Sequence, residues 1–171
     1  MALRRGVYPG SFNPPTIAHM AIAEAAREQR SLDQIVFAIS SVALAKPTSG
    51  VPDVDVRARW VRDAVAHWPW AKVEIVAAQL LVDIAAGFDV VIMGEDKWEQ
   101  INDPQFYGHS DSGRDAALAR LPELAIAPRR NHAEDQSTLP DRTAIQVDSW
   151  TADVSSTAVR QGSFEWRAQP N

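Results

Sequence analysis

Short apolar runs alternate with longer stretches of helical character along this chain of 171 residues. The clearest run is Gln34–Ser40, in which the five interior positions are Ile, Val, Phe, Ala and Ile. A strand that is apolar at every interior position is buried on both faces, which is typical of a parallel sheet covered by helices. The alternation therefore predicts an α/β protein whose strands run in parallel.

The same patterns place the remaining elements. Strands are predicted at residues 3–8, 34–40, 72–76 and 89–93, with weaker candidates at 123–127 and 143–147. Helices are predicted at residues 16–30, 54–68, 78–86 and 155–161. Two polar segments, residues 95–113 and 128–141, are predicted to be loops, and long loops in such domains often serve as lids or substrate loops. The length fits a single domain over residues 1–171.

Composition narrows the classes of function. The net charge is −5, from 17 Lys and Arg against 22 Asp and Glu, which argues against broad binding to nucleic acid. The absence of cysteine excludes a disulfide framework, a thiolate nucleophile and a cysteine-based metal site. The first residues reach a Pro-Gly turn before an apolar run as long as a signal peptide develops, and no stretch approaches a membrane span. We expect a cytoplasmic protein with no membrane partner.

One loop has the character of a phosphate site. Gly10 follows the first predicted strand and lets a ligand approach the backbone, while the helix start that follows offers free N–H groups to an anion. Thr16 can cap that helix, and His19 lies in its first turn. On these two residues alone, an ordinary cap and a surface histidine remain the simpler interpretation.

The wider context favours a ligand site. The segment Tyr8-Pro-Gly-Ser-Phe-Asn-Pro-Pro-Thr-Ile-Ala-His19 resembles the first signature of the nucleotidylyltransferase superfamily, a Gly-Ser/Thr-Phe-Asp/Asn-Pro opening followed by (His or Thr)-x-Gly-His. Val154-Ser-Ser-Thr-Ala-Val-Arg160 resembles the second signature, Ile-Ser-Ser-Thr-x-x-Arg. Their order and spacing also fit the family, and together they bracket residues 3–162.

The resemblance implies a Rossmann-like, doubly wound parallel sheet with helices on both faces and ATP over its switch point. It implies ATP contacts from Gly10, Ser11, Phe12, Gly94, Asp96, Ser155, Ser156 and Thr157. The charge-stabilising residues would be Thr16, His19, Lys46 and Arg160. Arg57 and Arg59 open the second helix and are interpreted as surface arginines.

The implied reaction suits this set of residues. A phosphorylated acceptor is already anionic near neutral pH, so it needs no general base to attack the α-phosphorus of ATP. The protein must instead align two polyanions and neutralise charge on the departing pyrophosphate. We expect Mg²⁺ to be held mainly by ATP oxygens and water, with no metal site made by the protein.

One position departs from the family pattern. Ala18 stands where the first signature has a glycine, and a methyl group there crowds a nucleotide that depends on close backbone approach. Ala18 therefore motivates an alternative, a nucleotide-binding regulatory protein that kept the fold without turnover. A fragment of a class I synthetase is disfavoured, because the chain has no second substrate domain and no lysine-rich signature loop.

The acceptor is predicted to be nicotinate or nicotinamide mononucleotide, in NAD biosynthesis. Val90-Val-Ile-Met-Gly-Glu-Asp-Lys-Trp98 and Leu121-Pro…Pro128-Arg129 resemble segments of the enzymes that use these acceptors. Trp98 would stack on the pyridine ring and Arg129 would meet a carboxylate, although packing at a loop edge explains Trp98 equally well. Thr16 and Gln79-Leu-Leu-Val-Asp-Ile-Ala instead resemble pantetheine-phosphate adenylyltransferases, which leaves that acceptor as the alternative.

Overall fold

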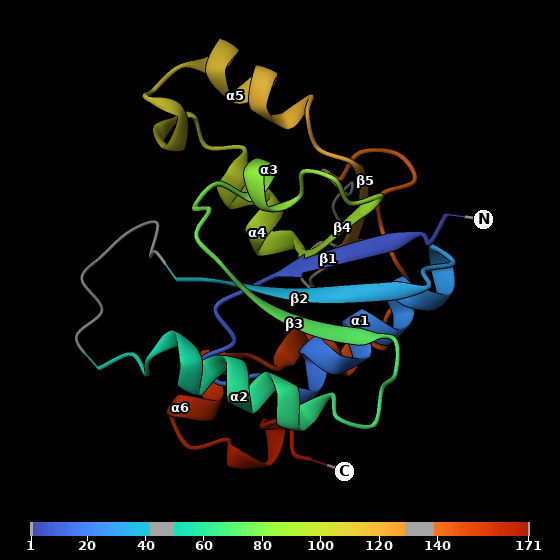
Figure 1. Cartoon of the computed structure of the whole chain (residues 1–171). Helices are drawn as coiled ribbons and strands as arrows, with labels where there is room; N and C mark the ends of the chain where they lie inside the picture. Colours follow the sequence, from blue (N-terminus) through green and yellow to red (C-terminus); the bar gives the residue numbers. More distant parts are fainter. Residues whose placement is uncertain (1, 42–49, 129–138, 171) are drawn as a thin grey trace.

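The computed structural model describes residues 2–41, 50–128 and 139–170 (Figure 1). Within these residues, five strands form one parallel sheet in the order β3-β2-β1-β4-β5. The strands are β1 (Arg5–Pro9), β2 (Gln34–Ser40), β3 (Ala71–Val76), β4 (Val90–Gly94) and β5 (Glu123–Ala127). The predicted α/β fold is confirmed, and each of these strands lies within two residues of its predicted bounds.

The sheet reverses its direction of winding beside β1. From β1 the chain moves outward to β2 and β3, then returns to the other side of β1 as β4 and continues outward to β5. Residues 5–9 of β1 pair in register with residues 34–38 of β2, while Gly6 and Val7 pair with Val90 and Val91 of β4. The carboxyl ends of β1 and β4 thus flank the switch point, where open α/β sheets bind their ligands.

Helices cover both faces of the sheet, as a doubly wound fold requires (Figure 1). On one side lie α1 (Ile17–Gln29), α2 (Val54–Ala64) and α6 (Ser156–Arg160); on the other lie α3 (Leu81–Ile84), α4 (Glu95–Ile101) and α5 (Asp111–Leu118). The described residues also form three short 3₁₀ helices, η1 (Pro104–Tyr107), η3 (Ser149–Asp153) and η4 (Phe164–Trp166). Among the described residues, no helix is both long and apolar enough to span a bilayer.

Side chains alternate between the two layers along each central strand. In β4, Val90 and Ile92 join the cluster on the α1 side, whereas Val91 and Met93 join the cluster on the α4 side. All four are at most 1% exposed. Burial on both faces explains why the central strands are continuous apolar runs.

Two helices are shorter than predicted. Helix α2 ends at Ala64 instead of Trp68. Pro69 disfavours helical backbone at the residue before it, so the helix does not include Trp68. Trp68 instead stacks on Trp70, with ring centroids 4.5 Å apart. Helix α3 covers only Leu81–Ile84 of the predicted residues 78–86. The hydroxyl of Ser40 donates to the Ala78 carbonyl oxygen at 2.8 Å and holds that residue at the end of β2, outside the helix.

The prediction of a loop over residues 95–113 is wrong. This segment contains α4 and η1, and α5 begins within it. Trp98 and Ile101 stand three residues apart on α4 and pack against the cluster that includes Met93, so very few apolar residues are enough to hold the helix. Ser110 caps α5 by accepting from the Gly113 N–H at 3.0 Å. The other predicted loop, residues 128–141, lies largely outside the described residues.

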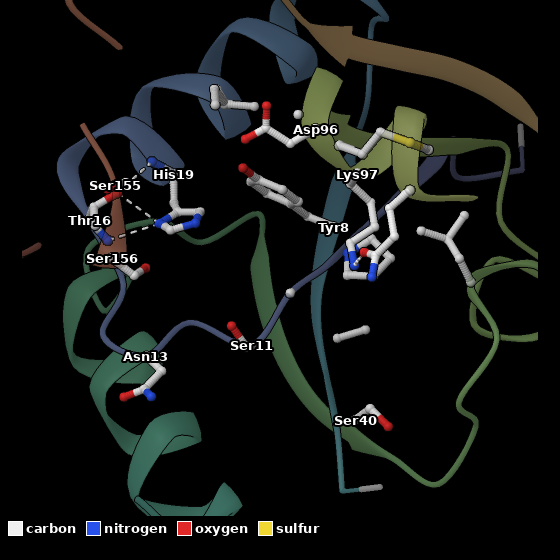
Figure 2. Close-up of a pocket in the computed structure, with 18 of the residues that line it drawn as sticks. Tyr8, Ser11, Asn13, Thr16, His19, Ser40, Asp96, Lys97, Ser155 and Ser156 are labelled. Carbon is white, nitrogen blue, oxygen red and sulfur yellow. Dashed lines mark hydrogen bonds between the residues drawn. The ribbon is translucent and has the colours of Figure 1, made fainter. Parts of the chain in front are cut away.

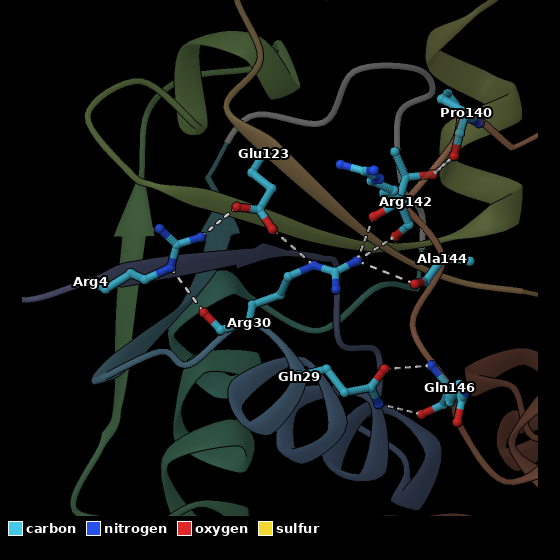
Figure 3. A network of polar contacts seen from close by, with 9 residues as sticks. Arg4, Gln29, Arg30, Glu123, Pro140, Arg142, Ala144 and Gln146 are labelled. Carbon is cyan, nitrogen blue, oxygen red and sulfur yellow. Dashed lines mark hydrogen bonds and ion pairs between the residues drawn. The ribbon is translucent and has the colours of Figure 1, made fainter.

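The weaker strand candidate at residues 143–147 is also wrong, and Figure 3 shows why. Only an isolated bridge between Ile126 and Ala144 joins this segment to β5. Other backbone groups near it bind side chains at the end of α1: Gln29 exchanges two hydrogen bonds with the Gln146 backbone, at 2.7 and 2.8 Å. The Arg30 guanidinium donates to three successive carbonyl groups from residue 142 onward, which satisfies them without a further strand.

Candidate active site

A cavity of about 810 Å³ opens at the switch point. It is lined by residues that follow four of the strands: Gly10 after β1, Ser41 after β2, Gly94 at the end of β4 and Pro128 after β5. This is the edge of the sheet that sequence reasoning selected, and the volume is within the range of small-molecule sites.

The structure brings most of the predicted site residues to this cavity. Those that line it are Gly10, Ser11, Thr16, His19, Gly94, Asp96, Ser155, Ser156 and Arg160. Those that do not are Phe12, Trp98 and Thr157. Lys46 and Arg129 lie outside the described residues.

His19 is oriented by Thr16 at the start of α1 (Figure 2). The Thr16 hydroxyl accepts from the His19 backbone N–H at 3.4 Å, and Nδ1 of His19 accepts from the Thr16 backbone N–H at 3.0 Å. Because Nδ1 is an acceptor, a neutral His19 ring carries its proton on Nε2. Thr16 was predicted to face phosphate, but it is 0% exposed and its oxygen lies 2.8 Å from Nδ1. Its observed part is to hold the His19 ring in this orientation.

Phe12 anchors the loop between β1 and α1 and does not line the cavity. Its ring is 1% exposed and packs against Tyr8, His19 and Phe37, with ring centroids 5.1 to 5.7 Å apart. Gly10 makes room for that ring, since a Cβ on Gly10 would lie only 2.8 Å from Phe12 Cζ. Phe12 therefore packs inside the protein instead of making the predicted contact with a nucleotide. The small size of Gly10 leaves space for the Phe12 ring.

Helix α6 is joined to the same loop. The Ser156 hydroxyl donates to the Pro14 carbonyl oxygen at 2.7 Å, and the Arg160 guanidinium donates to the Asn13 carbonyl oxygen. Ser155 caps the helix by accepting from the Ala158 N–H at 3.1 Å. The two predicted signatures, which are far apart in the chain, therefore form one wall of the cavity.

Thr157 and Trp98 are turned to other partners. Thr157 accepts a hydrogen bond from Arg160 at 2.9 Å. Trp98 packs against the cluster on the α4 side of the sheet, which includes Val91 and Met93. The interpretation of Trp98 as a packing residue therefore agrees with the structure, and the stacking role that was predicted for it is not supported.

Arg57 is a cavity residue that sequence reasoning assigned to the surface. Its Nη1 donates to the Ser11 carbonyl oxygen at 2.7 Å, and its Nε donates to the Pro52 carbonyl oxygen at 3.1 Å. Burial lowers the pKa of Arg57, although the Asp53 carboxylate opposes this shift. The signal in the sequence was its place in the first turn of α2, a helix that begins on the ligand-binding edge.

The wall opposite α1 and α6 was missed, because it belongs to the segment that was predicted to be a loop. Lys97 and Gln100 of α4 and Phe106 and Tyr107 of η1 line the cavity there. The Tyr107 hydroxyl donates to the Ile101 carbonyl oxygen at 2.9 Å, and burial raises the pKa of Tyr107. This wall combines an amino group with aromatic rings.

The described residues contain no group of three His, Asp or Glu side chains that could hold a metal ion, either in this cavity or elsewhere.

Fold and cavity together define a Rossmann-like protein whose loop between β1 and α1 and two helix starts line a cavity at the switch point. A family model described as Cytidylyltransferase-like matches residues 7–162, and the chain belongs to this family. The nucleotidylyltransferase superfamily that the two signatures indicated is thereby confirmed.

Curated relatives fall into two groups. A Gloeobacter violaceus protein named "Probable nicotinate-nucleotide adenylyltransferase" is 29% identical over 191 residues, covering 98% of this chain and 89% of the relative. A Bacteroides thetaiotaomicron protein of the same name is 26% identical and covers 95% of this chain and 83% of the relative. A Cutibacterium acnes protein named "Phosphopantetheine adenylyltransferase" is 36% identical but covers 53% of this chain and 55% of the relative.

Proposed function

We propose that this protein transfers AMP from ATP to the phosphate of a pyridine mononucleotide, producing a dinucleotide and pyrophosphate. The observation that carries the proposal is a single cavity with the oriented His19 ring on one wall and Phe106 and Tyr107 on the other. The curated relatives that match nearly the whole chain are named for nicotinate nucleotide, which supports the same acceptor. The predicted enzyme class, a nucleotidyltransferase, agrees with the family and with every relative described above.

The reaction needs alignment more than proton transfer. An oxygen of the acceptor's phosphate attacks the α-phosphorus of ATP and forms the new P–O bond. The bond from the α-phosphorus to the oxygen that bridges it to the β-phosphate breaks, and its electron pair leaves with pyrophosphate. Negative charge grows on the departing group, and we assign its stabilisation to His19, whose ring lines the cavity beside Ser155 and Ser156. The hydroxyls of Ser155 and Ser156 lie at the same wall and are candidates for further phosphate contacts.

Loop 10–15 is held in place by hydrogen bonds from α2 and α6. Arg57 secures it through Ser11, and α6 secures it through Asn13 and Pro14. A rigid loop loses little conformational freedom on binding ATP, which raises affinity and keeps the α-phosphorus aligned. Arg160 acts here through the Asn13 carbonyl, so we assign it a positioning role in addition to its positive charge.

Mg²⁺ enters the proposal as part of the Mg–ATP complex. The wall beside His19 offers hydroxyls and backbone N–H groups, and the described residues provide no cluster of carboxylates there. Mg²⁺ keeps several waters and binds readily to nucleotide phosphates, so this donor set fits a metal held by ATP. An ATP-dependent reaction of this kind also fits the predicted cytoplasmic location.

The aromatic pair on η1 is the proposed platform for the pyridine ring. Phe106 and Tyr107 are half-buried and line the cavity, and a flat ring gains stacking energy on such a surface. They take over the part that sequence reasoning gave to Trp98. Arg129 keeps its predicted contact with a carboxylate only as a hypothesis, because it lies outside the described residues.

A second acceptor is favoured by a specific observation. Leu80, Leu81 and Ile84 also line the cavity, and an apolar wall of this kind would suit the flexible arm of 4′-phosphopantetheine. The relative with that activity shares about half of this chain. We rank this acceptor second, because the relatives that cover nearly the whole chain carry the other name.

The decisive experiment measures pyrophosphate release from ATP and Mg²⁺ with nicotinate mononucleotide, nicotinamide mononucleotide and 4′-phosphopantetheine side by side. We expect a higher kcat/KM with a mononucleotide. Phe106→Ala should raise the KM of that acceptor on the order of tenfold, since stacking contributes about 1–3 kcal/mol per base. Phe164→Ala is the matched control, because Phe164 is 69% exposed. A higher kcat/KM with 4′-phosphopantetheine would show that it is the acceptor instead of a mononucleotide. ATP binding without transfer to any of the three would support the alternative of a regulatory protein without turnover.

A further inference from the structure

Lys97 differs in its setting from the other cations of the cavity. Among the described residues, the lysine and arginine side chains that line it are Arg57, Lys97 and Arg160. Arg57 and Arg160 both donate to backbone carbonyl groups of loop 10–15. Lys97 comes from α4, in the opposite layer, and its Nζ donates to the amide oxygen of Gln100 at 2.5 Å. A neutral amide leaves the positive charge of Lys97 uncompensated in that contact.

The surroundings of Lys97 favour an anionic partner. Burial lowers the pKa of Lys97, because the ammonium group has lost part of its hydration. A partly desolvated ammonium gains more from a carboxylate than a fully exposed one does, because less hydration remains to be lost when the pair forms. The rest of this wall combines aromatic and apolar side chains, Phe106 and Tyr107 on η1 and Leu81 and Ile84 on α3, with two polar ones on α4. These are the Gln100 amide and the Asp96 carboxylate, which also lines the cavity.

The position of Lys97 separates it from the reacting phosphates. Figure 2 draws His19, Ser155 and Ser156 together on one side of Tyr8, with Lys97 on the other side. The acceptor's phosphate must reach the α-phosphorus of ATP on the His19 side, and its ribose separates this phosphate from the pyridine ring. In the proposed reaction, the ring end of the acceptor would therefore extend toward Lys97.

We propose that Lys97 is the residue that selects an acidic acceptor, by pairing its ammonium group with the carboxylate on the pyridine ring of nicotinate mononucleotide. This assignment rests on the proposed function and deepens it. The amide of nicotinamide mononucleotide presents no charge to Lys97, so it gives the half-buried ammonium group no counterion. The enzyme should therefore prefer the acid to the amide.

The test compares kcat/KM and the calorimetric Kd for both mononucleotides in the wild-type protein, Lys97→Met and Lys97→Arg. Lys97→Met keeps a long side chain without the charge, and should lower kcat/KM for the acid on the order of tenfold or more while the amide changes little. Lys97→Arg should restore most of the preference for the acid. Lys72→Met is the matched control, because Lys72 is exposed on β3 and does not line this cavity.

The outcomes separate the two proposals. If Lys97→Met lowers kcat/KM equally for both acceptors, then Lys97 acts on a group that the two acceptors share. The assignment of Lys97 to the carboxylate is then overturned. A wild-type protein that prefers the amide, or a Lys97→Met variant that keeps the preference for the acid, overturns it as well. In those cases the proposed function stands, since a mononucleotide is still used. If the wild-type protein uses neither mononucleotide, both proposals fail together.

Discussion

Truncation of Phe12 tests whether the nucleotide loop is held down by a buried ring. Phe12 is 1% exposed and contacts Tyr8, His19 and Phe37, yet its backbone has a φ of 45°, in the left-handed region. That conformation costs a residue other than glycine about 1–2 kcal/mol, so packing of the ring must more than offset it. Phe12→Ala keeps this backbone cost and removes the ring. We expect a loss of about 3–5 kcal/mol in the free energy of unfolding, which lowers Tm by roughly 6–20 °C in a chain of this size.

Urea denaturation followed by tryptophan fluorescence provides the measurement, since the chain has 6 tryptophans. Phe164→Ala is again the control: its ring is 69% exposed, and its loss should change stability by less than about 0.5 kcal/mol. The ATP affinity of Phe12→Ala should fall as well, although the ring does not line the cavity. If Phe12→Ala lowers the free energy of unfolding no more than Phe164→Ala does, the reasoning is refuted, because the Phe12 ring would then not hold the loop.

Three further predictions concern the chemistry. His19→Ala should lower kcat on the order of 100-fold or more while the Kd for ATP stays within a few-fold, and a near-normal kcat would remove His19 from the mechanism. Ala18→Gly should tighten ATP binding or raise kcat, because Ala18 is 4% exposed and lines the cavity; an unchanged Kd and kcat would show that the site fits alanine. Finally, the preference for acid over amide should be complete at neutral pH and fade as pH rises. Burial lowers the pKa of Lys97 from the ordinary value of 10.5, so its charge is lost at a lower pH than in a free lysine. Other charged groups act on both acceptors, so they should not change the ratio of kcat/KM for the acid to kcat/KM for the amide. A ratio that stays constant up to pH 10.5 would contradict the role of Lys97.

Local sequence was enough to predict the sheet and the two ends of the site. An apolar run such as Gln34–Ser40 has few alternatives to a buried strand, and glycine and proline between a run and a helix mark where the chain turns. The two signatures placed His19, Ser155 and Ser156 at helix starts, where the structure finds them lining one cavity. Capping needs only residues three apart, so these contacts are specified before the chain folds.

The polar segment after β4 shows where local patterns are insufficient. Helix α4 is seven residues long and η1 is four, and helices this short have little stability of their own. Helix α4 forms because Trp98 and Ile101 pack on an apolar surface of the sheet, which composition within the segment does not reveal. The Tyr107 hydroxyl then joins η1 to the end of α4 by donating to the Ile101 carbonyl oxygen. Phe106 and Lys97 reach the cavity for the same reason, so the acceptor wall escaped prediction.

By itself, the sequence determined the strands, the helices that alternate with them and the loop between β1 and α1, because apolar runs, turn residues and caps depend on neighbours along the chain. Only the tertiary structure decided which side chains face the cavity and which face the protein. Phe12 and Trp98 turned inward, whereas Arg57 and Lys97 turned toward the site. The physical reason is that the orientation of each side chain depends on the free energy of burying a ring or desolvating a charge, and on the contacts that distant segments provide. Those partners come together only when the strands have assembled and the helices have packed on both faces.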